Sequence, residues 1–328
     1  MAGSESLRRK DREDRYVGAL LGTAYGDALG AGVEGMSRAE IRGRFGEVRD
    51  FLPHRGAGRY TDDTQMTLAL ALSLIRVGDV EGADCARCYE ELFDPERGYG
   101  RSAAAVLEAL RGGADYRRTG TMLFAAGSFG NGAAMRIAPV GLVFGSGDPD
   151  KLRAKVFEAV RCTHVHPEAV DGATIQALAV SLMARSDGRT PVDSAGMLER
   201  LREVCRTEAL HRKLRDAEDL LADRASDDEA VRVLGTGVAS AESVPAAIFT
   251  ALRYGADPEE ALVKAVGLGG DTDTIAAMTG ALMGALYGRD HFPQRWFDAL
   301  ENGRHGRDEI VLAARRLALV AEAMMGGR

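Results

Sequence analysis

Glycines at four-residue intervals are the feature that most restricts how this chain can fold. One row consists of Gly18, Gly22, Gly26 and Gly30, and a shorter row near the other end of the chain consists of Ala276, Gly280 and Gly284. A glycine inside a helix is about 1 kcal/mol less favourable than alanine, so the first row weakens its own helix. Close approach of two helices along their four-residue ridges is the best physical reason to tolerate this loss. We therefore expect these helices to cross at the centre of the molecule; a loose glycine-rich loop is the alternative.

Most of the chain has the residue preferences of α-helix. Ala, Leu, Arg and Glu dominate, and strict alternation of apolar and polar residues is scarce. The polar stretch 212–229 could form a surface helix or a loose connection. The helices expected from the pattern are 16–29, 66–77, 101–111, 152–160, 167–185, 194–209, 244–254, 257–266, 275–287 and 309–324. The predicted fold class is therefore all-α.

One compact domain is the economical organisation for a chain of this length. The 328 residues contain no periodic repeat and no low-complexity linker. We expect a single helical bundle over residues 16–328, preceded by a charged segment, residues 1–15, that is disordered. We also expect the protein to be a monomer.

Charge and hydropathy exclude several classes of partner. The net charge of −7 argues against binding to duplex nucleic acid, which usually needs a basic face. No uninterrupted run of 18 apolar residues occurs, so no membrane span is predicted. Residues 1–15 lack the apolar core of a signal peptide. Four cysteines, including a lone C-x-x-C pair at Cys85 and Cys88, fit buried thiols in a reducing compartment better than a zinc site. We therefore expect a cytoplasmic protein.

Two short acidic clusters, T-D-D-T at 61–64 and D-T-D-T at 271–274, each precede an apolar helical stretch. Two carboxylates about 4 Å apart repel each other by roughly 4 kcal/mol at an effective dielectric constant near 20. If the fold brings the clusters together, their four carboxylates must bind cations or take up protons. Oxygen ligands without His or Cys favour Mg²⁺, Mn²⁺ or Ca²⁺ over zinc. Two divalent ions would balance the charge.

Helix capping is the plainer interpretation of each cluster. Asp and Thr are favoured N-caps, and Asp62 with Gln65 has the spacing of a capping box. One capping side chain per helix is enough, however, and each cluster has more. Within a helix Asp271 and Asp273 would point about 200° apart, whereas in an extended turn they share one side. The glycines just before Asp271 permit such a turn.

Several motifs together resemble the ADP-ribosylglycohydrolases, the ADP-ribosyl-acceptor hydrolase family. The resemblance extends over nearly the whole chain, and the motifs occur in the order typical of the family. They are G-A-L-L-G-T-A-Y-G-D-A-L-G from Gly18, Y-T-D-D-T-Q-M from Tyr60, F-G-N-G-A-A-M-R from Phe129, G-L-G-G-D-T-D-T-I-A from Gly267 and G-A-L-Y-G ending at Gly288. The resemblance implies a compact all-α bundle with a binuclear magnesium centre.

The resemblance also implies roles for individual residues. Two Mg²⁺ ions, with Mn²⁺ as an alternative, would be held by Thr61, Asp62, Asp63, Asp271, Asp273 and Thr274. Glu34, in G-A-G-V-E-G, matches a glutamate on a mobile loop beside the metals and would act as general acid or base, or position the attacking water. The alternative for Glu34 is a solvated loop charge.

Two glycine loops and one histidine match the family's contacts to ADP-ribose. These residues are Gly98, Tyr99, Gly100, Gly127, Ser128, Phe129, Gly130, Asn131 and His164. Backbone amides of a glycine loop at a helix start can bind a pyrophosphate, and Tyr99 or Phe129 could stack on adenine or ribose. A plain turn, buried aromatic rings and a structural histidine are the respective alternatives.

Two segments resemble the branch of the family that cleaves ADP-ribose from serine, poly(ADP-ribose) and O-acetyl-ADP-ribose. They are D-G-A-T-I-Q-A-L-A-V from Asp171 and A-S-A-E-S-V-P-A-A-I from Ala239. The A-P-V shortly after Arg136 resembles a second branch, which acts on ADP-ribosyl-arginine. We therefore expect a Mg²⁺-dependent hydrolase that acts on ADP-ribosylated proteins or poly(ADP-ribose) and releases ADP-ribose. The alternatives are an ADP-ribosyl-arginine hydrolase, a non-catalytic ADP-ribose-binding protein, and a structural helical protein whose acidic clusters only cap helices.

Overall fold

A computed structural model describes residues 2–53 and 56–326, and within this part the chain contains helices but no strand. The longer helices are α1 (Ala2–Gly30), α2 (Arg38–Phe45), α3 (Asp62–Val77), α4 (Gly82–Leu92), α5 (Arg101–Arg111), α9 (Pro149–Val160), α10 (Pro167–Arg185), α11 (Ser194–Glu203), α12 (Glu208–Ala222), α13 (Asp227–Leu234), α14 (Ser240–Arg253), α15 (Pro258–Gly267), α16 (Thr272–Tyr287) and α18 (Arg307–Gly326). The short ones are α6 (Tyr116–Thr119), α7 (Gly132–Met135), α8 (Ala138–Phe144), α17 (Gln294–Ala299) and the 3₁₀ helices η1 (Ala31–Val33), η2 (Pro95–Arg97) and η3 (Arg289–His291). The all-α prediction is confirmed.

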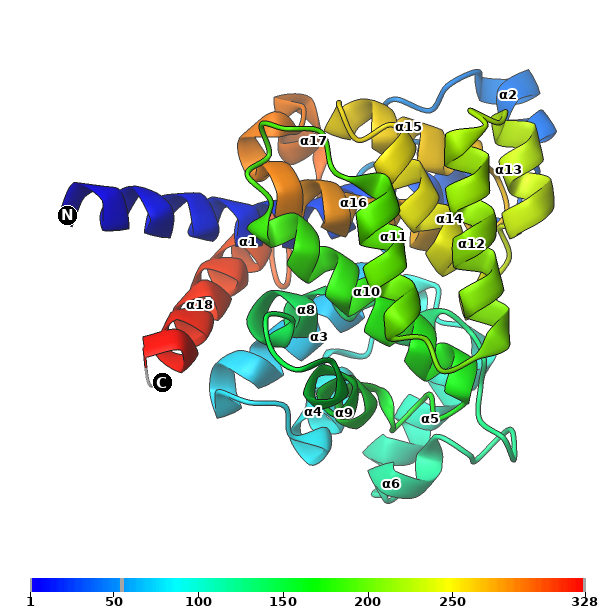
Figure 1. Cartoon of the computed structure of the whole chain (residues 1–328). Coiled ribbons are helices and arrows are strands. Elements are labelled where there is room, and N and C mark those ends of the chain that lie inside the picture. The colour runs from blue at the N-terminus through cyan, green and yellow to red at the C-terminus, as the bar shows by residue number, and fades with distance from the viewer. Residues whose placement is uncertain (1, 54–55, 327–328) are drawn as a thin grey trace.

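The crossing of α1 and α16 is the centre of the bundle (Figure 1). A Cβ placed on Gly22 would lie 2.1 Å from the carbonyl oxygen of Gly280, and one placed on Gly284 would lie 1.9 Å from that of Gly18. Only glycine permits this separation of the two backbones, so both rows serve close helix packing, as predicted. Residues Thr272 to Leu286 of α16 are all buried. Helices α10, α14 and α15 cover α16, while α3 and α18 pack against α1.

Helix boundaries differ from the prediction at the starts of α3 and α16 and within the expected helix 194–209. Helices α3 and α16 begin at Asp62 and Thr272 rather than at residues 66 and 275, so the acidic clusters form their first turns. The expected helix 194–209 is interrupted, because α11 ends at Glu203 and α12 begins at Glu208. The polar stretch 212–229 belongs to α12 and α13, with a short break between them.

The N-terminal segment, residues 1–15, was expected to be disordered. In the structure, residues 2–15 are the first part of α1, which projects from the body of the molecule (Figure 1). Arg15 anchors this part, because its guanidinium donates to the carbonyl oxygens of Ala184 and Asp187 over 3.3 and 3.2 Å. Residue 1 lies outside the described residues. No helix among the described residues is both long and apolar enough to cross a bilayer.

Candidate metal centre and substrate cleft

The first turns of α3 and α16 meet although about two hundred residues separate them in the sequence. The hydroxyl of Thr274 donates to the carboxylate of Asp63 over 3.3 Å, and the hydroxyl of Thr61 lies 3.4 Å from the same carboxylate oxygen. The last glycine of the first row, Gly30, lies against the backbone of the second acidic cluster. A Cβ on Gly30 would lie 2.5 Å from the Cα of Asp273. The close crossing of α1 and α16 therefore also fixes the position of the second acidic cluster.

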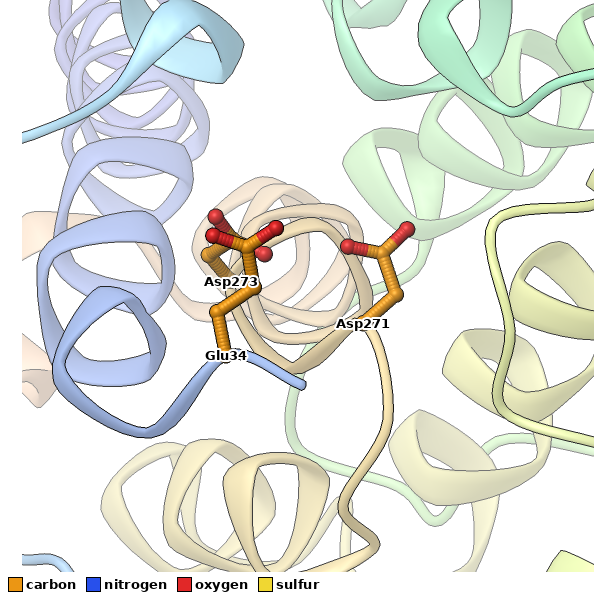
Figure 2. Close-up of side chains that lie close together, drawn as sticks. All are labelled: Glu34, Asp271 and Asp273. Carbon is orange, nitrogen blue, oxygen red and sulfur yellow. The ribbon is translucent and has the colours of Figure 1, made fainter. Parts of the chain in front are cut away.

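Glu34 joins the cluster from the loop that follows η1. Carboxylate oxygens of Glu34, Asp271 and Asp273 all lie within 4.8 Å of one another, and Figure 2 shows Glu34 reaching from its loop toward the start of the helix that carries the two aspartates. Two backbone hydrogen bonds, from Gly35 N to Gly270 O and from Gly270 N to Met36 O, each 2.8 Å long, tie the Glu34 loop to the turn before Asp271. Gly270 has a φ of +79°, a conformation that L residues rarely adopt.

The side chains of the two clusters do not serve as N-caps. Neither Thr61 nor Asp271, the N-cap residues of α3 and α16, makes a side-chain capping bond. The capping box expected for Asp62 and Gln65 is wrong, because the Gln65 side chain instead accepts a hydrogen bond from the hydroxyl of Tyr99 over 2.8 Å. Helix capping therefore does not account for the clusters.

Asp27 performs the capping of α3 from a different helix. This fully buried residue of α1 accepts hydrogen bonds from the backbone N–H groups of Thr61 (2.8 Å) and Thr64 (3.0 Å), and from the Thr64 hydroxyl (2.6 Å). Asp27 was not predicted from the sequence. Its signal was present in G-A-L-L-G-T-A-Y-G-D-A-L-G, because a single carboxylate within such an apolar, glycine-rich helix needs buried partners.

Burial raises the pKa values of the four aspartates of the centre, Asp62, Asp63, Asp271 and Asp273. Burial, together with the neighbouring charges of Asp27, Glu34 and Asp271, raises the pKa of Asp62 to about 8. Burial also raises the pKa values of Asp63 and Asp273 well above their usual range, and acidic neighbours add to the effect. The Oδ1 atom of Asp63 is buried without a hydrogen-bond partner among the described residues. An all-oxygen donor set with an unpartnered buried oxygen fits hard divalent cations.

A cavity of about 300 Å³ extends from the acidic centre. Its acidic side is lined by Glu34, Asp62, Asp63, Asp271, Asp273 and Thr274. The remaining walls include six of the residues expected to contact ADP-ribose, namely Gly98, Gly100, Ser128, Gly130, Asn131 and His164. Most of the predicted metal ligands and of the predicted ligand-binding residues therefore share one cavity.

Comparison with known proteins agrees with this geometry. The model of the ADP-ribosylglycohydrolase family matches residues 8–325. The chain belongs to the ADP-ribosylglycohydrolase family. ADP-ribosylhydrolase ARH3 of Homo sapiens is 30% identical over 344 residues, which cover 92% of each chain. An uncharacterized protein of Archaeoglobus fulgidus is 34% identical over 301 residues, which cover 88% of this chain and 92% of the relative.

A solved structure supports the same relationship at the level of the fold. The structure of an ADP-ribosylglycohydrolase-related protein complex is similar with a TM-score of 0.73 and 31% identity, covering 95% of this chain and 99% of that one. The chain is therefore an ADP-ribosyl hydrolase with the fold of this family. The family is metal-dependent, and the carboxylate cluster described above can hold metal ions.

Four residues predicted from the resemblance to ADP-ribosylglycohydrolases do not line the cavity; they are Thr61, Tyr99, Gly127 and Phe129. The ring of Tyr99 packs edge-on against Phe93 with ring centroids 4.8 Å apart, so it faces a neighbouring side chain. Phe129 is 54% exposed and contacts His166 with ring centroids 6.0 Å apart. Gly127 has a φ of +82° and forms a turn against Val165.

The cavity of this ADP-ribosylglycohydrolase also has lining residues that were not predicted from the sequence as site residues. Leu123 and Phe124 line it while remaining 48% and 50% exposed. They follow Met122 in a short apolar run between two expected helices, and an apolar run in a loop is a signal for a ligand surface. Arg101, Arg136 and Thr163 also line the cavity.

His164 is buried and electrically neutral. Burial, assisted by the positive charge of Arg136, lowers the pKa of His164 to about 3. Its Nδ1 atom lies 2.8 Å from the hydroxyl oxygen of Thr163. The imidazole can therefore donate or accept hydrogen bonds at the cavity wall, but it does not carry a charge near neutral pH.

Proposed function

We propose that this ADP-ribosyl hydrolase requires Mg²⁺ and releases ADP-ribose from serine-linked adducts, poly(ADP-ribose) and O-acetyl-ADP-ribose. The observation that carries the proposal is the shared cavity, in which a carboxylate cluster faces a wall of glycine loops, a neutral histidine and exposed apolar side chains. Such a cavity complements a ribose at its acidic end and a diphosphate with an adenine beyond it.

The proposed ligands of two divalent ions are Thr61, Asp62, Asp63, Asp271, Asp273 and Thr274. Their oxygen chemistry suits Mg²⁺, with Mn²⁺ as an alternative. Bound divalent ions orient vicinal hydroxyls and polarise nearby oxygens. Asn131 supports this arrangement, because its side-chain amide donates to the Asp271 carboxylate and to the hydroxyl of Ser243.

Glu34 is the proposed general acid or base. It is exposed, whereas Asp271 and Asp273 beside it are buried, so its carboxylate can exchange protons with water in the cavity. Hydrolysis of a glycosidic bond needs a positioned water and a proton for the leaving oxygen, and passes through an oxocarbenium-like transition state. Glu34 would deliver or accept the proton, and the surrounding carboxylates would stabilise the positive charge that develops on the sugar.

The other walls suit the remainder of ADP-ribose. Gly98, Gly100, Ser128 and Gly130 bring backbone close to the cavity with no acidic side chain among them, which permits the approach of a diphosphate. Leu123 and Phe124 offer an exposed apolar surface on which adenine could lie.

The resemblance of the segment that begins at Ala239 supports the serine-type assignment, and this part of the chain contacts the loop proposed to bind the diphosphate. The N–H of Ser240 donates to Phe129 O over 3.0 Å, and the N–H of Asn131 donates to Val238 O over 2.9 Å. By contrast, the A-P-V segment starts α8 and is buried in the core, so its resemblance to the arginine branch carries less weight.

A panel of four substrates tests the proposal. Purified protein with Mg²⁺ is offered serine-linked, arginine-linked and polymeric ADP-ribose and O-acetyl-ADP-ribose, and released ADP-ribose is quantified. We expect release from all but the arginine-linked substrate. Selective release from the arginine adduct would establish the alternative branch. Calorimetric binding of ADP-ribose without turnover of any substrate would establish a non-catalytic binding protein.

We propose a monomer that acts in the cytoplasm without nucleic-acid or membrane partners. All four cysteines are free thiols, and three of them are buried, which suits a reducing compartment.

A further inference from the structure

Arg136 is an unusual group beside the cavity, because it is a buried cation without a carboxylate partner among the described residues. The side chain is 1% exposed. One terminal guanidinium nitrogen donates to the carbonyl oxygen of Gly132, and the other terminal nitrogen donates to the hydroxyl oxygen of Thr163 over 2.6 Å. The ring of Tyr89 lies 4.6 Å from the guanidinium carbon. Burying a charge without an opposite charge beside it costs free energy of folding. The contacts that Arg136 makes therefore point to a role at the cavity.

The hydroxyl of Thr163 lies between Arg136 and His164 and hydrogen-bonds to both. The hydroxyl oxygen of Thr163 has three neighbours: Arg136, the carbonyl oxygen of Val160 at 3.2 Å and Nδ1 of His164 at 2.8 Å. Arg136 can only donate, so the single hydroxyl proton must go either to Val160 or to His164.

The carbonyl oxygen of Val160 is already satisfied. It accepts the backbone N–H groups of Thr163 over 3.0 Å and of His164 over 2.9 Å, and these two bonds occupy both of its lone pairs. The Thr163 hydroxyl therefore donates to Nδ1 of His164, which is also the nearer acceptor. Because a neutral imidazole carries one proton and its pKa is depressed to about 3, that proton sits on Nε2.

Nε2 is the ring atom left for a ligand. It has no hydrogen-bond partner among the described residues, and His164 lines the cavity. The ring lies against the backbone of Gly132, where a Cβ would approach it to 2.9 Å. Since Arg136 also holds the carbonyl of Gly132, a single guanidinium fixes both the ring and the loop beside it.

We propose that Arg136 and Thr163 are positioning residues that hold His164 in its Nε2–H tautomer, so that the imidazole donates a hydrogen bond to a diphosphate oxygen of ADP-ribose. The opposite tautomer would present a lone pair to an anionic oxygen and repel it. The identity of the acceptor rests on the proposed function, whereas the tautomer follows from the hydrogen-bond partners of Thr163 together with the neutral state of the buried ring.

The tautomer can be measured directly in the ligand-free protein. We expect two-bond ¹H–¹⁵N spectra of the full chain to show a protonated Nε2 and a bare Nδ1 for His164, identified by the signals lost in His164→Gln. Thr163→Val, which keeps the side-chain shape but lacks the hydroxyl, should change this pattern, and Thr163→Ser should preserve it. A wild-type spectrum with the proton on Nδ1, or an unchanged spectrum in Thr163→Val, would overturn the assignment.

ADP-ribose binding tests the role of the donor. By calorimetry, Thr163→Val should weaken the Kd by about tenfold, the typical effect of one lost hydrogen bond to a charged group, and Thr163→Ser should stay within about twofold. Equal Kd values for Thr163→Val and wild type would overturn the positioning role. If the wild type binds no ADP-ribose, the proposed function and the diphosphate acceptor both fail, while the spectra still decide the tautomer.

Discussion

Glu34 has a different environment from the other carboxylates of the centre. It is exposed and lies on a loop, whereas Asp271 and Asp273 are buried at the start of α16. The buried pair is suited to holding cations and the exposed group to moving protons. Substitution of Glu34 should therefore lower the rate of the chemical step, whereas substitution of the buried aspartates should weaken cation binding.

Glu34→Gln should reduce kcat by about a hundredfold or more, the usual contribution of general acid–base catalysis, while the Kd for ADP-ribose changes little. Glu40→Gln is the matched control, because Glu40 is an exposed glutamate in the capping box of the neighbouring helix α2. Kinetics with a serine-linked peptide and calorimetry with ADP-ribose measure the two effects. If Glu34→Gln kept the wild-type kcat, Glu34 would not be the general acid or base.

Asp27 does not line the cavity, yet its carboxylate holds Thr61 and Thr64 and thereby the first turn of α3. Asp27→Asn places an amide among these donors. Because partners of metal ligands typically influence metal affinity 10- to 100-fold, we expect the Mg²⁺ concentration for half-maximal activity to rise by about that factor. Asp223→Asn, at the exposed end of α12, is the control. Identical Mg²⁺ dependence in both variants would contradict the role of Asp27.

The raised pKa values predict how pH affects the metal-free protein. Folded-state pKa values of about 6 for Asp27 and about 8 for Asp62 lie above the ordinary value of 3.8. Such groups favour the folded state fully only below the unfolded pKa, and this stability is lost as pH rises through the folded pKa. The increase in Tm caused by Mg²⁺ should therefore be larger at about pH 8 than at about pH 5. A Mg²⁺ effect independent of pH would argue against cations replacing protons.

At the scale of elements, the contact between α1 and α16 fixes the metal centre, so its glycines should be intolerant of substitution. Gly280→Ala would place a Cβ 1.9 Å from the carbonyl oxygen of Gly22, and the helices must separate to accept it. We expect a loss of stability of about 1–3 kcal/mol, as for overpacking in a core, together with a loss of activity. Urea unfolding of the variant and of the wild type measures the change.

Gly43→Ala is the matched control for this prediction. Gly43 also lies inside a helix, α2, but a Cβ there would meet no atom within 4 Å. Alanine at such a position stabilises a helix by about 1 kcal/mol. If Gly280→Ala were as stable as Gly43→Ala, the glycine rows would not be required for helix contact.

The helices themselves were largely predictable, but their functional ends were not. Apolar periodicity predicted the interior of α16, whereas its first turn consists of Asp and Thr, which have little helix propensity and suggest a loop. That turn is helical because tertiary contacts support it, such as the bond from the Thr272 hydroxyl to Gly30 O over 2.9 Å. Short helices such as α7 and α8 were missed because they are too brief to show a period.

At the scale of the whole molecule, the site is built from segments far apart in the sequence, and no short sequence pattern shows that these segments meet. Residue chemistry alone predicted cation ligands at 61–64 and 271–274, and the resemblance to the family added Glu34, the glycine loops and His164. Neither identified Asp27 or Phe124, whose importance depends on which surfaces the fold brings together. Neither predicted that Tyr99 does not line the cavity, since its contact with Phe93 depends on the tertiary fold.

The central claim is that the carboxylates of α3 and α16 hold divalent cations that the hydrolysis requires. The most direct measurement is the rate of ADP-ribose release from a serine-linked peptide by chelator-treated protein, as free Mg²⁺ is restored. We predict no turnover without the metal, full recovery with it, and no recovery in a folded Asp273→Asn variant. Undiminished turnover in EDTA, or normal recovery in Asp273→Asn, would contradict the account.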